Sequence, residues 1–288
     1  MSVAILPYGK KPGLALSKLP LSELRWPLGV PEPLEGTVGD LGPDDHLLVY
    51  PNSRLYYLPH PGVRCRVSVV IVEPEAVHGY HMKLMRLYHR RFHRVLTCNR
   101  ALIEAIPNAL HYVYGSTWVS TQNLDRTKTK NLSLIASSKQ VHEGHRLRHA
   151  TADWLRESGV EADIMGRGYQ PFTMKSDGLA PYRYSVIIEN VREQSFFTEK
   201  LIDCLLCDTV PIYWGAPDIG HYFDTSGMLI CNDLDDIKAA VKGLSDSDYE
   251  AHGPAILKNR NTAAQYADPE VTAARLLLTG RMLAEEPS

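Results

Sequence analysis

The sequence predicts an α/β protein with two lobes, each built around a parallel sheet that helices cover on both faces. Short apolar strands alternate with helices along most of the 288 residues, and such alternation produces right-handed βαβ units. The segment 67–73, VSVVIVE, is apolar at nearly every position, as expected of a parallel strand buried on both faces. A polar run at 120–130, STQNLDRTKTK, separates two such series.

The first lobe is expected over residues 1–120, and the Pro- and Gly-rich segment 11–45 within it as irregular surface connection. Its other predicted elements are strands at 2–6, 47–50, 67–73 and 94–97 and a helix at 100–106. The basic segment 81–94, HMKLMRLYHRRFHR, predicts an amphipathic helix with apolar residues at helical spacing. The alternative is a face that binds an anionic acceptor, such as a phosphorylated glycan or a polynucleotide.

A linker at 121–130, a second lobe at 131–262 and a closing helix within 263–288 complete the prediction. The second lobe's strands are predicted at 132–136, 162–165, 184–189, 210–214 and 228–231, and its helices at 144–158, 198–207 and 234–244. Two sheets that face each other across a cleft are expected to bind a ligand there, near the carboxyl ends of the strands.

Composition excludes several classes of protein. The chain is 44% hydrophobic and carries a net charge of −2, so no overall field draws it to nucleic acid or anionic lipid. Five scattered cysteines do not form a disulfide framework and indicate a reducing, cytoplasmic compartment. Cys204 and Cys207 lie in mid-helix, where burial is a better explanation than redox chemistry. Neither a signal peptide nor a membrane span is expected.

The segment 184–217, YSVIIENVREQSFFTEKLIDCLLCDTVPIYWGAP, joins two apolar strands through a helix. Thr198 is a favoured N-cap residue, and Glu199 in the first turn complements the helix dipole. Lys200 is unfavourable there unless an anion lies beside it. A diphosphate would be such an anion, and the alternative is that Lys200 extends to solvent. Free backbone N–H groups at this sheet edge also predict a phosphorylated ligand.

Glu189 and Asn190 end the first of these two strands. A carboxylate at the end of a buried strand is costly unless it meets donors such as sugar hydroxyls or backbone N–H groups. We therefore expect both residues to face a polar ligand.

The pattern Y-x-x-x-x-E-N, then F-F-T-E-K-L, then V-P-I-Y-W-G-A-P resembles the donor-binding signature of the α1,3/4-fucosyltransferases, glycosyltransferase family 10. The similarity is dense over 184–217 and looser over 131–233. It implies a GT-B fold, with GDP-fucose on the second lobe and the acceptor on the first. It also implies inversion at the anomeric carbon, with neither a metal ion nor another cofactor.

The resemblance assigns roles within this signature. Glu199 would hold the ribose or sugar hydroxyls of the donor, Lys200 its diphosphate, and Glu189 and Asn190 the sugar side. The family usually has Tyr where this chain has Phe196, so one hydroxyl donor to the diphosphate is missing.

Further donor contacts are expected from two other strand-to-helix regions. Arg167, in IMGRGY, matches a position where the family places a diphosphate-binding arginine, and a guanidinium grips two phosphate oxygens in a fork. Alternatively, Arg167 is a surface residue in a Gly-rich turn. Ser137, Ser138 and Lys139 follow the strand LSLIA on the same edge. Arg146 lies in the first turns of the next helix, as a donor contact or on a solvated face.

Glu73 is the predicted catalytic base. It ends the buried strand 67–73 and precedes a proline, and the family carries a glutamate of this kind near this place. An inverting transfer needs a base that faces the acceptor hydroxyl, with a pKa raised only modestly by partial burial. Glu75 and His78 are the rival candidates.

Asp233, Asp235 and Asp236, in NDLDD, have the spacing of a metal-binding D-x-D motif. They fall at the start of a predicted helix, where acidic residues complement the dipole, so no metal site is expected.

The sequence thus predicts an inverting transfer of fucose from GDP-fucose to a glycan hydroxyl. One alternative is a glycosyltransferase that uses another nucleotide sugar or modifies a nucleic acid. A second is a module that binds nucleotide sugars without catalysis.

Overall fold

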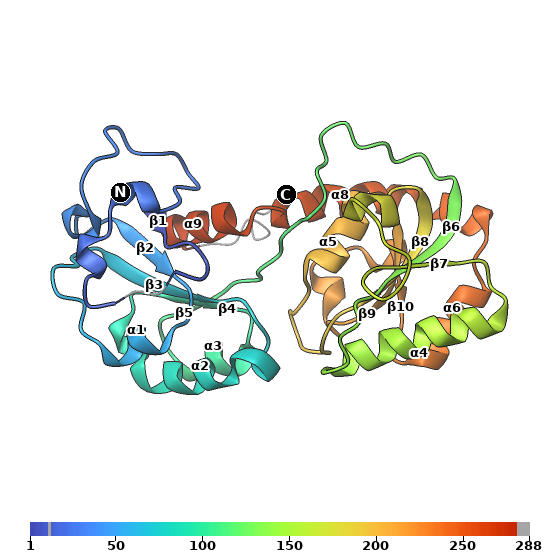
Figure 1. Cartoon of the computed structure of the whole chain (residues 1–288), viewed down its shortest axis with the longest axis horizontal. Helices are drawn as coiled ribbons and strands as arrows, with labels where there is room; N and C mark the ends of the chain where they lie inside the picture. Colours follow the sequence, from blue (N-terminus) through green and yellow to red (C-terminus); the bar gives the residue numbers. More distant parts are fainter. Residues whose placement is uncertain (11–12, 281–288) are drawn as a thin grey trace. The chain divides into compact units, whose positions relative to one another are not determined.

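The computed structural model describes residues 1–10 and 13–280, and it divides into two compact α/β units (Figure 1). Unit 1 comprises residues 1–10, 13–114 and 269–280, and unit 2 comprises residues 115–268. Each unit holds a five-stranded sheet in which all neighbouring strands pair in parallel. The predicted α/β class with two parallel sheets is confirmed.

In unit 1 the strands lie in the order β1-β2-β3-β4-β5. The strands are β1 (Val3–Ile5), β2 (His46–Val49), β3 (Arg66–Ile71), β4 (Val95–Thr97) and β5 (Ala109–His111). The helices are α1 (Ser53–Tyr57), α2 (Glu75–Tyr88), α3 (Arg100–Ala105) and α9 (Pro269–Thr279), with short 3-10 helices η1 (Leu16–Lys18), η2 (Leu21–Glu23), η3 (Val38–Asp40) and η4 (His89–Arg91).

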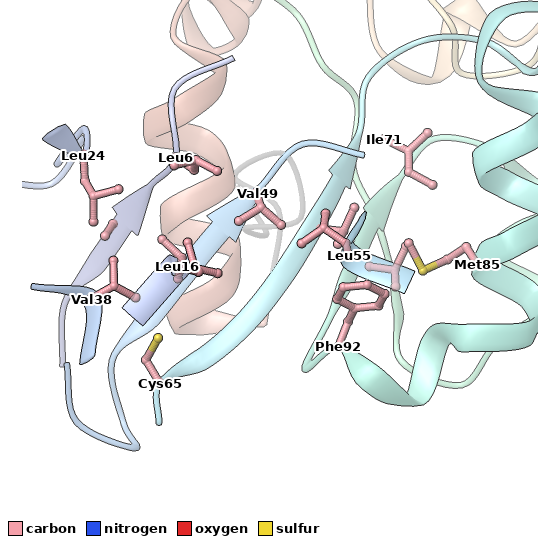
Figure 2. Close-up of a cluster of buried hydrophobic side chains, with 14 of the residues drawn as sticks. Leu6, Leu16, Leu24, Val38, Val49, Leu55, Cys65, Ile71, Met85 and Phe92 are labelled. Carbon is pink, nitrogen blue, oxygen red and sulfur yellow. The ribbon is translucent and has the colours of Figure 1, made fainter. Parts of the chain in front are cut away.

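The core of unit 1 shows where the prediction for residues 11–45 was too simple. The segment is irregular, as predicted, but it is not only surface. Leu16, Leu24 and Val38 are buried and pack into one cluster with Val49 and Ile71 of the sheet (Figure 2). Short 3-10 turns with single inward side chains leave no periodic pattern, so the sequence concealed this contribution.

Helix α2 and the turn after it account for most of the basic segment 81–94. Met82, Met85 and Phe92 are buried in the core of unit 1, which confirms the amphipathic helix. Arg91 donates hydrogen bonds to the backbone oxygens of Leu55 and Leu58. Part of the basic character therefore serves the fold, and this weakens the case for an anionic acceptor on this face.

In unit 2 the order is β10-β9-β8-β6-β7. The strands are β6 (Lys130–Ile135), β7 (Asp163–Met165), β8 (Tyr182–Ile188), β9 (Val210–Trp214) and β10 (Leu229–Ile230). The helices are α4 (Glu143–Ser158), α5 (Glu199–Leu206), α6 (Leu234–Lys242), α7 (Asp246–Ala251) and α8 (Gly253–Tyr266), with η5 (Lys175–Gly178), η6 (Ile219–His221) and η7 (Thr225–Gly227).

The strand order of unit 2 reverses between β6 and β8. After β6 the chain adds β7 on one side, and then it returns to add β8, β9 and β10 on the other. In open α/β sheets, ligands bind outside the carboxyl ends of the strands at such a switch point. The topology therefore directs attention to the residues that follow β6 and β8.

Residues 121–130 do not behave as the predicted linker, because the structure places them within unit 2. Arg126 Nε donates to the backbone oxygen of Leu206 at 2.8 Å. Lys128 Nζ donates to the backbone oxygens of Ala180 and Cys207 at 2.8 and 2.7 Å, and burial lowers the pKa of Lys128 to about 8. Polar side chains here pair with backbone carbonyls, which the composition of the segment does not reveal.

The C-terminal region also differs from the single closing helix predicted within 263–288. Helix α8 ends at Tyr266 in unit 2, and α9 begins at Pro269 in unit 1. Glu270 pairs with Arg25 at 2.8 Å, and Tyr112 donates to the backbone oxygen of Pro269 at 2.6 Å. The proline divides the two helices, and the part of the prediction beyond residue 280 lies outside the described residues.

Two smaller predictions are confirmed. Cys204 and Cys207 are fully buried, and burial raises the pKa of Cys207 to about 12, so these thiols are structural. Asp233 caps helix α6 by accepting from the backbone N–H groups of Asp235 and Asp236. In residues 1–10 and 13–280, no helix combines the length and apolar character that crossing a membrane requires.

Candidate functional site

A pocket of about 350 Å³ lies at the switch point of unit 2. We call it the carboxyl-edge pocket, because residues that follow β6, β7 and β8 line it. Its polar and aromatic lining residues are Trp118, Ser137, Lys139, His145, Arg148, Arg167, Phe172, Lys175, Asn190, Glu199 and Lys200. The predicted residues Lys139, Arg167, Asn190, Glu199 and Lys200 are therefore brought together from four separate regions of the sequence.

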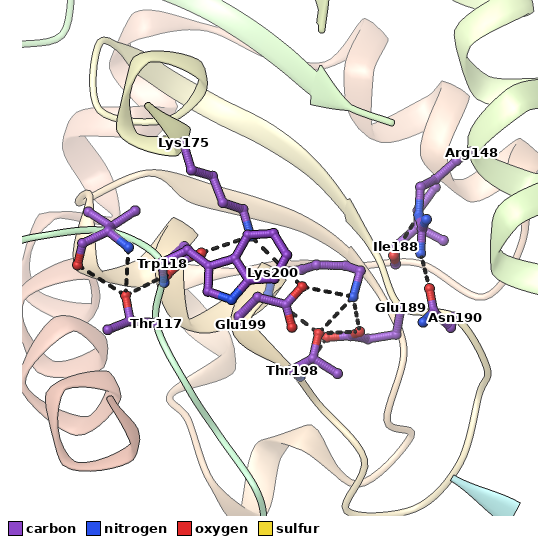
Figure 3. Close-up of polar contacts among 12 residues, drawn as sticks. Thr117, Trp118, Arg148, Lys175, Ile188, Glu189, Asn190, Thr198, Glu199 and Lys200 are labelled. Atoms are coloured by element: carbon purple, nitrogen blue, oxygen red, sulfur yellow. Dashed lines mark hydrogen bonds and ion pairs between the residues drawn. The ribbon is translucent and has the colours of Figure 1, made fainter. Parts of the chain in front are cut away.

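Glu189 anchors the start of helix α5 beneath this pocket. It is fully buried, and its carboxylate accepts from the backbone N–H and the hydroxyl of Thr198, both at 2.8 Å (Figure 3). Thr198 caps the helix as predicted. Neither side chain lines the pocket, so Glu189 meets its expected donors in the protein and not in a ligand. The backbone N–H of Thr198 is likewise already satisfied.

Lys200 Nζ lies 3.4 Å from Glu189 Oε2, 3.3 Å from Glu199 Oε1 and 2.9 Å from Thr198 Oγ1. The protein itself thus supplies anions beside this lysine, which the sequence argument sought in a ligand. The lysine side chain nevertheless keeps 23% of its surface exposed and lines the pocket. Its ammonium group is held in place by protein carboxylates and remains accessible.

Glu199 sits between two lysines. Burial opposes ionisation of its carboxyl group, but Lys200 and Lys175 outweigh burial and lower the pKa of Glu199. Lys175 Nζ lies 3.9 Å from Glu199 and 2.8 Å from the buried carboxylate of Asp203. The result is a row of alternating charges along one wall of the pocket (Figure 3).

Arg148, on helix α4, lies apart from this row and forms a separate group with Ile188 and Asn190 (Figure 3). Its Nε donates to the backbone oxygen of Ile188 at 2.9 Å, and its Nη2 donates to Asn190 Oδ1 at 2.7 Å. Helix α4 can approach the end of β8 this closely because Gly144 has no side chain. A Cβ atom at this position would lie 1.7 Å from the backbone oxygen of Glu189. Arg148 is 5% exposed, and burial lowers its pKa against the opposing effect of Glu189 and Glu199.

His145 adds a neutral donor to a cationic site. It is 5% exposed, and burial, with Arg148 next, lowers its pKa to about 4. The backbone N–H of His142 donates to Nδ1 of His145 at 3.1 Å. Because Nδ1 accepts this bond, the ring proton of the neutral imidazole is placed on Nε2.

The loops after β6 and β7 supply Lys139 and Arg167. Gly166 has φ +114°, and a Cβ atom there would lie 2.1 Å from the Ala136 oxygen, so glycine is required where the two loops touch. Arg167 follows directly and is exposed at the pocket rim. Ser138 is exposed next to this contact and is not among the lining residues, whereas Ser137 is.

Arg146 and Phe196 are placed differently from the prediction. Arg146 is exposed on α4 and donates to the backbone oxygen of Val141, whereas Arg148, two residues later, faces the pocket. Phe196 is 4% exposed and lies outside the pocket lining. The missing tyrosine hydroxyl is therefore not a gap in the wall of this pocket.

Several lining residues escaped the sequence analysis. Arg148 lies on the buried face of α4 with Thr151, Ala152 and Leu155, so the helical periodicity of that face held a usable signal. Trp118, Phe172 and Lys175 come from irregular segments and gave no local signal.

The charge balance of the pocket favours an anion. Five cationic side chains line it: Lys139, Arg148, Arg167, Lys175 and Lys200. The carboxylates that pair with or lie beside them are Glu189, Glu199 and Asp203. Cations remain in excess over carboxylates, and a nucleoside diphosphate or its sugar ester would balance them.

The three candidate bases lie in unit 1, at the carboxyl end of β3. Glu73 follows the strand at an intermediate exposure, and Glu75 is the first residue of α2. His78 lies in the first turn of α2 and lines a cavity of about 180 Å³ with Tyr8, Tyr50 and Asn52 among others. Burial, with His81 next, lowers the pKa of His78 to about 4, which makes it a weak base near pH 7.

Comparison with known proteins agrees with this architecture. Residues 125–250 match a sequence model described as glycosyltransferase family 10 (fucosyltransferase), C-terminal part. Over 67 residues the chain is 30% identical to the α-(1,3)-fucosyltransferase FucT of Helicobacter pylori, which covers 23% of this chain and 14% of that protein. The chain thus spans a small part of the length of this curated relative.

Two solved structures show the same fold. One is an α1,3-fucosyltransferase with GDP-fucose, at a TM-score of 0.51 and 16% identity, covering 78% of this chain and 72% of that chain. The other is an α-glucosyltransferase with UDP-glucose and DNA that contains an abasic site, at a TM-score of 0.53 and 12% identity, covering 80% and 78%.

The fold therefore defines the class: an α/β protein with the GT-B fold, as predicted. Within that class, the segment 125–250, which carries most of the carboxyl-edge pocket, is similar to the C-terminal part of glycosyltransferase family 10. The predicted resemblance is confirmed.

Proposed function

We propose that the protein transfers a fucosyl group from GDP-fucose to a hydroxyl group of a glycan, with inversion at the anomeric carbon. The observation that carries the proposal is the excess of cations in the carboxyl-edge pocket, within the family 10 segment. A GDP-sugar presents a diphosphate that these cations would neutralise. The solved neighbours are described with both GDP and UDP sugars, so the family segment and not the fold favours GDP-fucose.

In the proposed reaction the acceptor oxygen bonds to the anomeric carbon while the bond from that carbon to the diphosphate oxygen breaks. The electron pair stays on the departing GDP, and the acceptor's hydroxyl proton passes to Glu73. Lys200 and Arg167 stabilise the charge that develops on GDP, and electrostatic stabilisation of this kind is usually the largest single contribution to catalysis. Arg148 and Asn190 hold the end of β8 in position through their mutual hydrogen bond.

A panel of nucleotides and nucleotide sugars tests the donor. A ligand that binds only the native state raises the melting temperature, so GDP and GDP-fucose are expected to stabilise the protein more than UDP, UDP-glucose or GDP-mannose. Incubation with GDP-fucose should then release GDP, slowly by hydrolysis and faster when a suitable glycan is added. Stabilisation without any turnover would identify a non-catalytic binding module instead, and a preference for UDP sugars would overturn the donor assignment.

Acceptor class, metal independence and a cytoplasmic location stay predictions. Retention on duplex DNA with a steep salt dependence would replace the glycan by a nucleic acid acceptor.

A further inference from the structure

Trp118 is a large aromatic side chain that is mostly exposed to solvent. It is 71% exposed, although it lines both the carboxyl-edge pocket and a wider hollow of about 980 Å³ that continues from it. The two hollows share Trp118, Phe172 and Lys175. An exposed indole does not contribute the free energy that its burial would give. A bound ligand that covered the ring would supply this burial.

Hydrogen bonds to Asp203 hold the backbone at Trp118 in place. Its N–H donates to Asp203 Oδ1 at 2.9 Å, and the Thr117 hydroxyl donates to the same oxygen at 2.6 Å. Asp203 is fully buried in α5. The backbone of Trp118 is thus bound to helix α5, which carries Glu199 and Lys200 in its first turn.

One face of the ring is occupied and the remainder is accessible. Lys175 Nζ lies 4.8 Å from the ring centroid and is itself held by Asp203 at 2.8 Å. A cation placed over an aromatic face is attracted by the ring quadrupole, so this contact orients the indole. Because most of the side chain is nevertheless exposed, a flat group has room to stack on the accessible face.

The order in which aromatic and charged side chains follow one another along the pocket indicates which flat group would stack on Trp118. From Trp118 the contacts run to Lys175, then to Glu199 at 3.9 Å, and then to Lys200 at 3.3 Å (Figure 3). Asn190 and Arg148 lie beyond Lys200 in the view of Figure 3. A nucleotide sugar has the corresponding order of base, ribose, diphosphate and sugar.

We propose that Trp118 is the stacking platform for the nucleobase of the donor, with Glu199 at the ribose and Lys200 at the diphosphate. This inference rests on the proposed function, since it takes a nucleotide sugar as the ligand. It assigns the base to Trp118, at the end of the region 1–120 that the sequence predicted as the first lobe, although the structure places this residue in unit 2. Stacking on an aromatic ring tolerates any base, so Trp118 would contribute affinity, whereas the choice of guanine would come from other groups.

Fluorescence offers a direct test, because Trp118 is the exposed one among the four tryptophans. Trp26 and Trp214 are 9% and 2% exposed, and Trp154 is intermediate. Saturating GDP is expected to quench Trp118 emission and to protect it from acrylamide, whereas inorganic pyrophosphate should bind without either effect. Quenching by free fucose or by a glycan, but not by GDP, would overturn the proposal in favour of a sugar platform.

Substitution separates stacking from charge. By calorimetry, Trp118→Ala should weaken GDP binding roughly 5- to 100-fold, the range expected for one stacked base, and change pyrophosphate binding less than about twofold. Trp118→Phe should restore most of the GDP affinity. Val141→Ala, at a residue that is 74% exposed and outside the pocket lining, is the matched control and should change neither. Equal weakening of GDP and pyrophosphate would show a merely structural role and overturn the proposal.

The outcome also distinguishes the two proposals. If UDP or ADP quenches Trp118 and GDP does not, the platform stands and the assignment of GDP-fucose falls. If GDP binds with Trp118 unquenched, the donor stands and the platform falls. If the protein binds no nucleotide at all, both are wrong.

Discussion

The two units share an architecture and differ in what their sheets present at the carboxyl edge. Each has five parallel strands, yet unit 2 collects five cationic side chains in one pocket there. The small cavity of unit 1 is lined by Tyr8, Tyr50, Asn52 and His78 among others, and Lys10 is the single lysine or arginine among the described residues of its lining. The same backbone plan therefore carries a pocket rich in cationic side chains in one unit and, in the other, a small cavity with a single lysine in its described lining.

This contrast lies in the loops after the strands and not in the sheets themselves. A sugar acceptor has hydroxyl groups and apolar ring faces, which aromatic and neutral polar side chains suit. A nucleotide donor needs charge. We therefore expect substitutions at the carboxyl edge of unit 1 and substitutions in the carboxyl-edge pocket of unit 2 to have separate effects on transfer and on nucleotide binding.

The largest effect is expected from Glu73→Gln in unit 1. Removing a general base typically lowers the rate by about 10²–10⁴-fold, so fucosyl transfer should fall by that factor. GDP affinity should remain unchanged, because the carboxyl-edge pocket, the proposed donor site, lies in unit 2. Glu75→Gln and His78→Asn serve as matched controls measured in the same transfer assay. A larger loss in either control than in Glu73→Gln would move the base to that residue.

Lys200→Ala in unit 2 is expected to act on both binding and transfer. One charge-assisted contact contributes about 1.5–3 kcal/mol, so transfer from GDP-fucose should slow by about 10- to 100-fold, with weaker GDP binding by calorimetry. Lys242→Ala, at the exposed end of α6, is the control. Near-full transfer by the Lys200 variant would remove the diphosphate from this part of the pocket.

A smaller and more local contrast lies within helix α4. Arg148→Lys cannot reproduce both hydrogen bonds to Ile188 and Asn190, so the free energy of unfolding should fall by about 1.5–3 kcal/mol and GDP should bind more weakly. Arg146→Lys, at an exposed position, should leave the melting temperature and the GDP affinity unchanged. Equal effects of the two substitutions would show that the helix face was assigned wrongly.

How much the sequence predicted follows from how local each signal was. The strand 210–214 and the helix start at Thr198 were found correctly, because apolar runs and N-caps are properties of neighbouring residues. Lys139 and Arg167 follow strands and Lys200 lies in the first turn of α5, and all three line the pocket because these regions share one edge of the sheet.

Other parts were hidden because they depend on distant partners. Glu189 looked like a ligand-facing residue, and only the folded structure shows Thr198 and Lys200 satisfying it. Lys128 looked solvated until its carbonyl partners were visible. The position of Trp118 depends on Asp203, which lies 85 residues away in the sequence, and no local pattern encodes such a contact.

The smallest expected effect is on how the stability of the protein depends on pH. In the folded protein the pKa of His145 is lowered from 6.5 to about 4, as is that of His46 in unit 1. Between these values the unfolded chain binds more protons than the native one, and stability therefore rises with pH. The contribution is complete above about pH 6.5 and is lost as the pH falls towards 4.

Chemical denaturation at several pH values measures this slope. The unfolding midpoint should decrease from pH 7 to pH 4, and His145→Gln in unit 2 or His46→Gln in unit 1 should each flatten the decrease in part. GDP binding should respond to the first substitution alone, because His145 lines the carboxyl-edge pocket, the proposed donor site, and His46 lies in the sheet of unit 1. A slope that neither substitution changes would mean that both imidazoles titrate normally and that acid lability arises elsewhere.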